Sequence, residues 1–126
     1  GIPNVNIVMV DVRDVAAHHF HAMVHPEADG KRFISAHEEP DSFFRVAEIL
    51  RSKGFDKAPA KKVPTLMLRV IALFDPEARG MLGFVDTHVS CDNSLTKKMF
   101  GWTPIPLEKT VSDMGQSIQK IIDKAA

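Results

Sequence analysis

The segments with strand character in this sequence are too few and too short to build a complete sheet. They are Asn4–Val12, Lys31–Ala36 and Val89–Cys91. Lys31–Ala36 has β-branched and aromatic side chains but no evident partner, so we expect an edge strand that joins a sheet supplied by residues outside the chain. The pattern indicates an α/β fold that is rich in helix and is not a self-sufficient doubly wound sheet.

Helical periodicity accounts for most of the remaining sequence. Asp14 is a suitable N-cap for the first helix, and Gly54 and Gly101 are suitable stops for the second and fourth. The predicted helices are Val15–His25, a segment that starts within Glu38–Ser42 and ends at Gly54, Thr65–Phe74, Leu95–Phe100 and Leu107–Lys124.

Composition excludes several classes of protein. The 126 residues carry 16 Lys and Arg against 16 Asp and Glu, so a net basic face for nucleic acid is not expected. No apolar run approaches the roughly 20 residues that span a bilayer, so no membrane partner is expected either. The single cysteine, Cys91, cannot form an intrachain disulfide, and a reducing, cytoplasmic location is the simplest interpretation.

The residues that most cofactor chemistry needs are missing from the sequence. There is no tyrosine, and the seven glycines never form a G-x-G-x-x-G or a P-loop pattern. These 126 residues alone therefore hold neither a tyrosine acid nor a dinucleotide fingerprint. The chain begins at Gly1 without methionine, which we interpret as an excised piece.

Four segments, in order, resemble the extended short-chain dehydrogenases/reductases of the NAD-dependent epimerase/dehydratase superfamily. Val12–Met23 resembles the family's V-x-D-V-A-x-A-H segment, and Gly30–Ala36 resembles a late strand of its sheet. Phe43–Leu50 resembles the helix that follows, and Asp92–Pro104 resembles its D-x-S-K-A-x-x-x-L-G-W-x-P segment. Val63–Leu82 looks most like the dihydroflavonol-reductase and cinnamoyl-CoA-reductase type.

The resemblance implies that residues 1–126 form one C-terminal substrate-binding domain of a Rossmann-type reductase. The parent protein would use NADP or NAD to reduce a small hydrophobic carbonyl substrate. The nucleotide loop and the Ser/Tyr/Lys group of the family map to no residue here, so the chain alone is expected to be inactive, with no catalytic, cofactor-binding or metal-binding residue of its own.

Two alternatives stay open. Nucleotide-sugar epimerases and dehydratases share the scaffold, but they commonly carry an arginine for the substrate diphosphate in the stretch matching Gly83–Cys91, which has none. A non-enzymatic metal-binding or interaction module is the other alternative.

The first helix is predicted to turn its apolar side chains inward: Ala16, Phe20, Met23 and Val24. A stripe of imidazoles follows the opposite face: His18, His21 and His25. Imidazole is a common metal ligand, but a solvated polar face explains this stripe better. His19 flanks the apolar face, and we expect it to be packed and hydrogen-bonded.

The other polar candidates have simpler structural explanations. Asp11 and Asp14 could form an acid–base pair, but helix capping accounts for Asp14. Capping also accounts for Asp92, Asn93 and Ser94. Cys91 lacks a basic neighbour and is predicted to be inert, and the predicted basic loop is solvated: Lys57, Lys61 and Lys62.

The predicted helix at Thr65–Phe74 is apolar on nearly every side, with Arg69 as its only charge. Such a helix is either deeply buried or faces a ligand. We assign Met67, Val70 and Phe74 as candidate substrate-binding residues, with plain core packing as the alternative. The exposed edge at Lys31–Ala36 further predicts self-association or strand exchange of the isolated chain.

Overall fold

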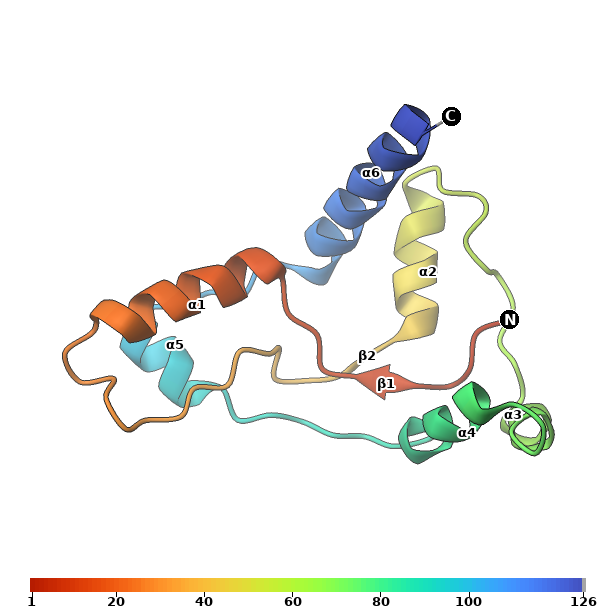
Figure 1. The fold of residues 1–126 in the computed structure, drawn as a ribbon, viewed down its shortest axis with the longest axis horizontal. Helices are drawn as coiled ribbons and strands as arrows, with labels where there is room; N and C mark the ends of the chain where they lie inside the picture. The colour runs from red at the N-terminus through yellow and green to blue at the C-terminus, as the bar shows by residue number, and fades with distance from the viewer. Residues whose placement is uncertain (126) are drawn as a thin grey trace.

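Two short strands lie in the middle of the molecule, and helices extend from them in three groups (Figure 1). The structure is a computed structural model that describes residues 1–125. Its elements, in chain order, are β1 (Asn6–Ile7), α1 (Val12–Val24), β2 (Asp41–Ser42), α2 (Phe43–Ser52), α3 (Thr65–Ile71), α4 (Pro76–Met81), the 3-10 turn η1 (Leu82–Phe84), α5 (Ser94–Phe100) and α6 (Leu107–Ala125). The α/β class is confirmed, with helix dominant.

The central group combines the two strands with α2 and α6. β1 and β2 are antiparallel, with Asn6 opposite Ser42. Ser42 then caps α2 by accepting a hydrogen bond from the backbone N–H of Arg45. The buried core between α2 and α6 is small, and its members come from both helices and the end of the first extended segment: Ile49, Leu107 and Val111, with Met9, Val46 and Leu50 beside them.

Gly115 allows α6 to approach the end of α2 closely. A Cβ at this position would lie 2.7 Å from Cε2 of Phe55 and 3.0 Å from Cδ2 of Leu50. Glycine lowers helix stability in a helix interior, so its presence here is explained by this contact. Beyond Gly115 the last turns of α6 extend past α2 (Figure 1).

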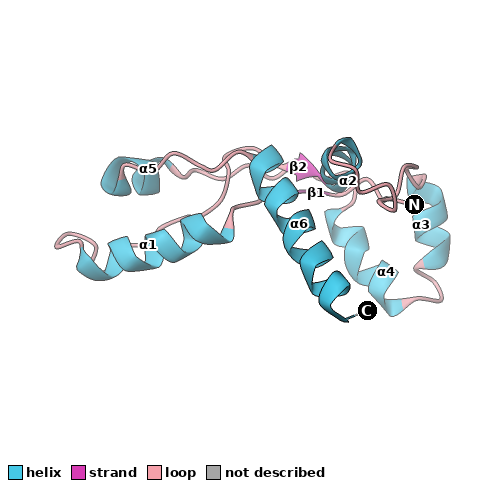
Figure 2. Cartoon of the chain, turned by 90° about the horizontal axis from the view of Figure 1, so that it is seen from above, coloured by secondary structure: helices cyan, strands magenta, loops and turns pink. Residues whose placement is uncertain are grey.

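The other two groups lie at opposite ends of the molecule (Figure 2). At one end α1 contacts α5. At the other end α3 and α4 enclose a second small core of Leu68, Ala72 and Ala78. Asp86 connects this end to the N-terminal segment, because its carboxylate accepts hydrogen bonds from Asn4 Nδ2 (2.6 Å) and Thr65 Oγ1 (3.1 Å).

The strand predictions are largely wrong. Of Asn4–Val12, only Asn6–Ile7 pairs in a named strand. Val89–Cys91 and Lys31–Ala36 form none. In Lys31–Ala36, two backbone carbonyls are already bonded to side chains of α5 and its N-cap. Thr96 Oγ1 donates to the carbonyl of Ile34 and Asn93 Nδ2 donates to that of Ala36, both at 2.8 Å.

The predicted helix stops at Gly54 and Gly101 are confirmed. Gly101 directly follows α5, Gly54 follows α2 after one intervening residue, and both adopt positive φ. The predicted cap of α1 is wrong. Asp11, not Asp14, is the N-cap, so the helix starts three residues earlier. Asp14 is buried within the first turn, where its Oδ2 accepts a hydrogen bond from the backbone N–H of Ile105 at 2.9 Å.

The predicted orientation of α1 is also wrong. Its apolar face is exposed, with Phe20 at 58% and Met23 at 77%, whereas His18 on the opposite face is 4% exposed. The reason is that α5, Trp102 after it and the segment around Ser35 cover the histidine face, and nothing in residues 1–125 covers the apolar one. None of the helices in these residues is both long and apolar enough to cross a bilayer.

Replacing Gly115 with valine should lower the free energy of unfolding by about 1–3 kcal/mol, because the side chain overlaps the Phe55 ring. Urea denaturation of the two proteins measures the change. Gly80→Val in α4 is the matched control, since a Cβ at Gly80 meets nothing within 4 Å. Equal effects of the two substitutions would contradict the close contact.

Candidate functional site

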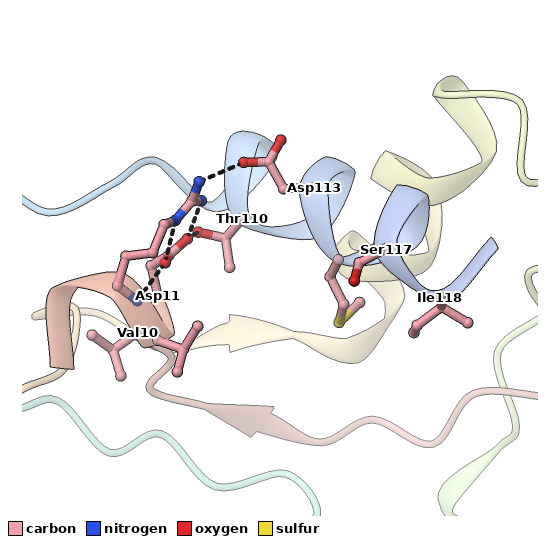
Figure 3. A pocket seen from close by; sticks show the side chains of 9 residues that line it. Val10, Asp11, Thr110, Asp113, Ser117 and Ile118 are labelled. Carbon is pink, nitrogen blue, oxygen red and sulfur yellow. Dashed lines mark hydrogen bonds and ion pairs between the residues drawn. The ribbon is translucent and has the colours of Figure 1, made fainter. Parts of the chain in front are cut away.

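A cavity of about 470 Å³ lies between the N-terminus of α1 and the middle of α6 (Figure 3). This volume is within the range of small-molecule sites. It is lined by residues from both helices and the segment before α1: Val10, Asp11, Val12, Arg13, Thr110, Asp113, Met114, Ser117 and Ile118.

A network of charged hydrogen bonds forms one wall of the cavity. Asp11 is almost fully buried, and its carboxylate accepts from Nε (2.8 Å) and Nη2 (2.6 Å) of Arg13 and from Oγ1 of Thr110 (2.7 Å). Nη1 of Arg13 donates to Asp113 at 2.7 Å. The Arg13 guanidinium, followed by Thr110, holds the pKa of Asp11 well below its usual range despite burial. Arg13 therefore fixes α1 to α6.

This network leaves little capacity for acid–base chemistry. The carboxylate of Asp11 is already bonded to three groups, and that of Asp113 is shared between Lys109 and Arg13, which together lower its pKa. Both stay ionised at neutral pH, so neither is placed as a general acid. Apart from Ser117, the rest of the cavity is apolar, which suits an uncharged apolar surface or ligand.

The β1-to-α1 connection does not fit a dinucleotide. A pyrophosphate binds to free backbone N–H groups at a helix N-terminus. Here the Asp11 carboxylate occupies that position, because it accepts from the N–H of Arg13 at 2.8 Å. The negative charge of Asp11 would also repel a phosphate. The described residues at this turn therefore do not form a nucleotide site.

The candidate substrate-binding residues Met67, Val70 and Phe74 lie together along one face of α3 and the turn after it. They are 55%, 52% and 86% exposed. None of them lines the large cavity, which is in the other half of the molecule. Plain core packing, the alternative interpretation, does not describe their surroundings here. Leu68 and Ala72 on the opposite side of α3 make the core contacts instead.

The predicted solvated histidine stripe is wrong. His18 is buried, and its ring packs edge-on against Trp102 with 4.4 Å between centroids. The ring of Phe100 lies 5.4 Å from His21 and 6.4 Å from His25. The histidines thus replace apolar side chains in the contact between α1 and α5. No group of three or more His, Cys, Asp or Glu side chains in residues 1–125 could hold a metal ion.

His19 is exposed rather than packed, and its Nδ1 is 2.8 Å from the carbonyl oxygen of Val15 in its own helix. The capping interpretation of Asp92, Asn93 and Ser94 is only partly right. Asp92 accepts from the N–H of Ser94 at 2.9 Å, but Asn93, at the N-cap position, makes no side-chain capping bond, and Ser94 is the first residue of α5.

Cys91 is partly buried and unbonded to another cysteine. In the basic loop, Lys57 and Lys61 are exposed as predicted, and Nζ of Lys62, also exposed, lies 4.4 Å from the centroid of the Phe44 ring.

The Arg13 network was not found by sequence analysis. Arg13 and Asp113 are 100 positions apart in the sequence, and an exposed-looking arginine after an N-cap gives no local signal of a distant partner. Comparisons with protein-family models, with curated proteins and with solved structures find no match to the chain.

Arg13→Met should lower the free energy of unfolding, because it leaves the buried Asp11 carboxylate without its cation. A fully buried pair would lose more, but Arg13 is itself half exposed. The pKa of Asp11 is depressed, so this contribution is complete above roughly pH 4 and declines as the pH falls further.

Denaturation at pH 7 and pH 3 measures this difference. Asp113→Asn is the control, since Asp113 is 36% exposed and its loss should lower stability less than Arg13→Met does. A difference between Arg13→Met and the wild type that grows on acidification would contradict the assigned role.

Proposed function

We propose that this chain is the substrate-binding portion of an NAD(P)-dependent carbonyl reductase of the extended short-chain type. In this proposal a nucleotide-binding part holds NADP or NAD and covers the exposed apolar faces. The face of α3 formed by Met67, Val70 and Phe74 contributes one wall of a pocket for a small hydrophobic carbonyl compound. The sequence resemblance and the open architecture support this reading.

The observation that carries the proposal is the amount of exposed surface. The accessible surface is 8690 Å² for a chain of 14.0 kDa. A compact monomer of this mass exposes about 6,700 Å². The excess, on the order of 2,000 Å², is larger than the roughly 800 Å² that each partner buries in a stable interface of standard size. A surface of this kind favours a chain that functions against a further folded part.

The location of the excess agrees with this interpretation. The outward face of α1 exposes large apolar side chains, as do the last turns of α6, where Ile121 is 64% and Ile122 54% exposed. The apolar cavity beside Arg13 lies between these two helices (Figure 3). We assign the α1 and α6 surface to contact with the nucleotide-binding part and the separate α3 face to substrate.

The division of labour follows from the residues present. The hydride chemistry belongs to the nicotinamide, and the protein orients the substrate and excludes water. The described residues of this chain supply an apolar wall, and the carboxylates of Asp11 and Asp113 at the cavity serve to join helices. The proton donor and the nucleotide cradle are assigned to the other part.

The nucleotide-sugar alternative is less well supported. Arg79 is the arginine nearest to the stretch where an epimerase binds diphosphate. Its guanidinium donates to the backbone carbonyls of Ala72 (3.1 Å) and Leu73 (3.2 Å) and so completes the end of α3. A diphosphate would have to displace these bonds. The metal-binding alternative has no ligand group in the described residues to support it.

Methyl NMR of the chain during titration with an aromatic aldehyde such as cinnamaldehyde tests the substrate face. We expect weak binding that shifts the Met67 and Val70 methyl signals. Val70→Asp should remove these shifts, whereas Val89→Asp, the same change at another exposed valine, should keep them. Shifts confined to Met114 beside the cavity would contradict the α3 assignment.

The proposal that the reactive groups lie outside this chain has a separate test. The chain alone should not oxidise NADPH in the presence of aldehydes or ketones, because none of its residues matches the reactive group of the family. Turnover above background that co-purifies with the chain would overturn the proposal.

Self-association of the isolated chain remains a prediction, but on a different basis. The carbonyls of Ile34 and Ala36 are bonded, so the predicted edge strand does not drive it. We expect the exposed apolar faces of α1 and α6 to drive the association instead. Sedimentation at increasing concentration should show association that a Phe20→Ser, Met23→Ser variant weakens. A strictly monomeric wild-type profile would count against it.

A further inference from the structure

His18 occupies an unusual position for an ionisable side chain. It is 4% exposed and lies where α1, α5 and the segment before β2 meet. Its ring is edge-on to Trp102 at 4.4 Å and tilted against Phe100 at 5.7 Å. A leucine or phenylalanine would be the ordinary residue in such surroundings. The imidazole therefore adds a titratable group to an otherwise apolar contact.

The hydrogen bonds of His18 suit only the neutral ring. Nδ1 lies 2.6 Å from Oγ of Ser35, and the hydroxyl can either donate or accept there. Nε2 is buried and finds no hydrogen-bond partner in residues 1–125. A protonated imidazole carries two N–H donors and a charge. One of these donors would lack an acceptor, and the charge would be buried.

The charged surroundings do not compensate for this burial. On its own helix, His18 is near Asp14, which favours the protonated ring, and near His19 and His21, which oppose it. The other elements offer Phe100, Trp102 and Ser35, none of which titrates in this range. Burial is the dominant influence and lowers the pKa of His18 below its ordinary value.

We propose that His18 is a pH-sensitive latch: the neutral ring holds α1 against α5 and the Ser35 segment, and protonation releases this end of the molecule. α1 contributes a single buried imidazole to the contact, and its remaining buried residue in the helix, Asp14, bonds to the backbone of Ile105. The histidine face is the covered side of α1, since Phe20 and Met23 on the opposite side are exposed. Loss of the His18 contact therefore weakens this joint, in which only the rings of His21 and His25 remain against Phe100.

The direction of the pH effect follows from the difference between the closed and open states. In the open state His18 titrates near its ordinary pKa of about 6.5. In the closed state its pKa is lower, so the open state binds more protons as the pH falls through 6.5. The closed state is fully favoured above about pH 7. Below 6.5 the ratio of open to closed molecules rises up to tenfold per pH unit, until the closed form also protonates.

The chain contains an internal reporter for this transition. Trp102 is its single tryptophan, and its ring contacts His18. Tryptophan fluorescence from pH 8 to pH 5 should change with a midpoint below 6.5, and a parallel fall should appear in urea stability. His18→Phe keeps an aromatic ring and removes the titration, so its signal should be flat in this range. His19→Gln, at the exposed neighbouring position, should behave like the wild type.

Two results would overturn the latch. One is a wild-type transition that persists unchanged in His18→Phe. The other is a transition that disappears in His19→Gln. If His18→Phe does not fold, NMR of the wild type decides: the imidazole signals of His18 must titrate together with the indole signal of Trp102. A His18 that titrates near 6.5 with no change at Trp102 would refute the proposal.

Discussion

The hydrogen-bonded bridge from Asp11 through Arg13 to Asp113 determines how α1 is joined to α6. Asp11 ends the segment that follows β1, starts α1 by capping it, and bonds to Thr110 of α6. Arg13 adds a second link to α6. One carboxylate thus sets both the start of α1 and its angle to α6. The cavity between the two helices exists because this link joins them at one end only (Figure 3).

Local signals in the sequence were sufficient for most helices and insufficient for the strands. Gly54 and Gly101 act within one turn of their own position, so their roles could be predicted. The cap of α1 was misplaced because both Asp11 and Asp14 are good caps, and the choice depends on Arg13 and Ile105. The segment at Lys31–Ala36 has strand composition, but its acceptors bond to side chains about 60 positions away, which no local pattern reveals.

The site was harder to predict because amphipathic patterns indicate that a helix has two faces and not which of them is covered. The pattern of α1 is clear, yet its histidine face is buried and its apolar face is exposed. In an ordinary single domain the reverse arrangement is the rule. The reversal is explained if the apolar face is reserved for a further folded part, as proposed. Under that proposal the histidines pack within the chain, and the apolar stripe provides the external contact.

The hydrogen bonds that Asn93 and Thr96 donate to the carbonyls of Ala36 and Ile34 affect how copies of the chain can meet. A segment with strand composition usually offers bare carbonyls that template ordered β-stacking. Here Thr96 is fully buried and both carbonyls that it and Asn93 hold are occupied, so a strand from another molecule must first dislodge a helix. This arrangement opposes fibril-like stacking through Lys31–Ala36 and leaves the exposed helix faces as the surfaces through which copies of the chain could meet.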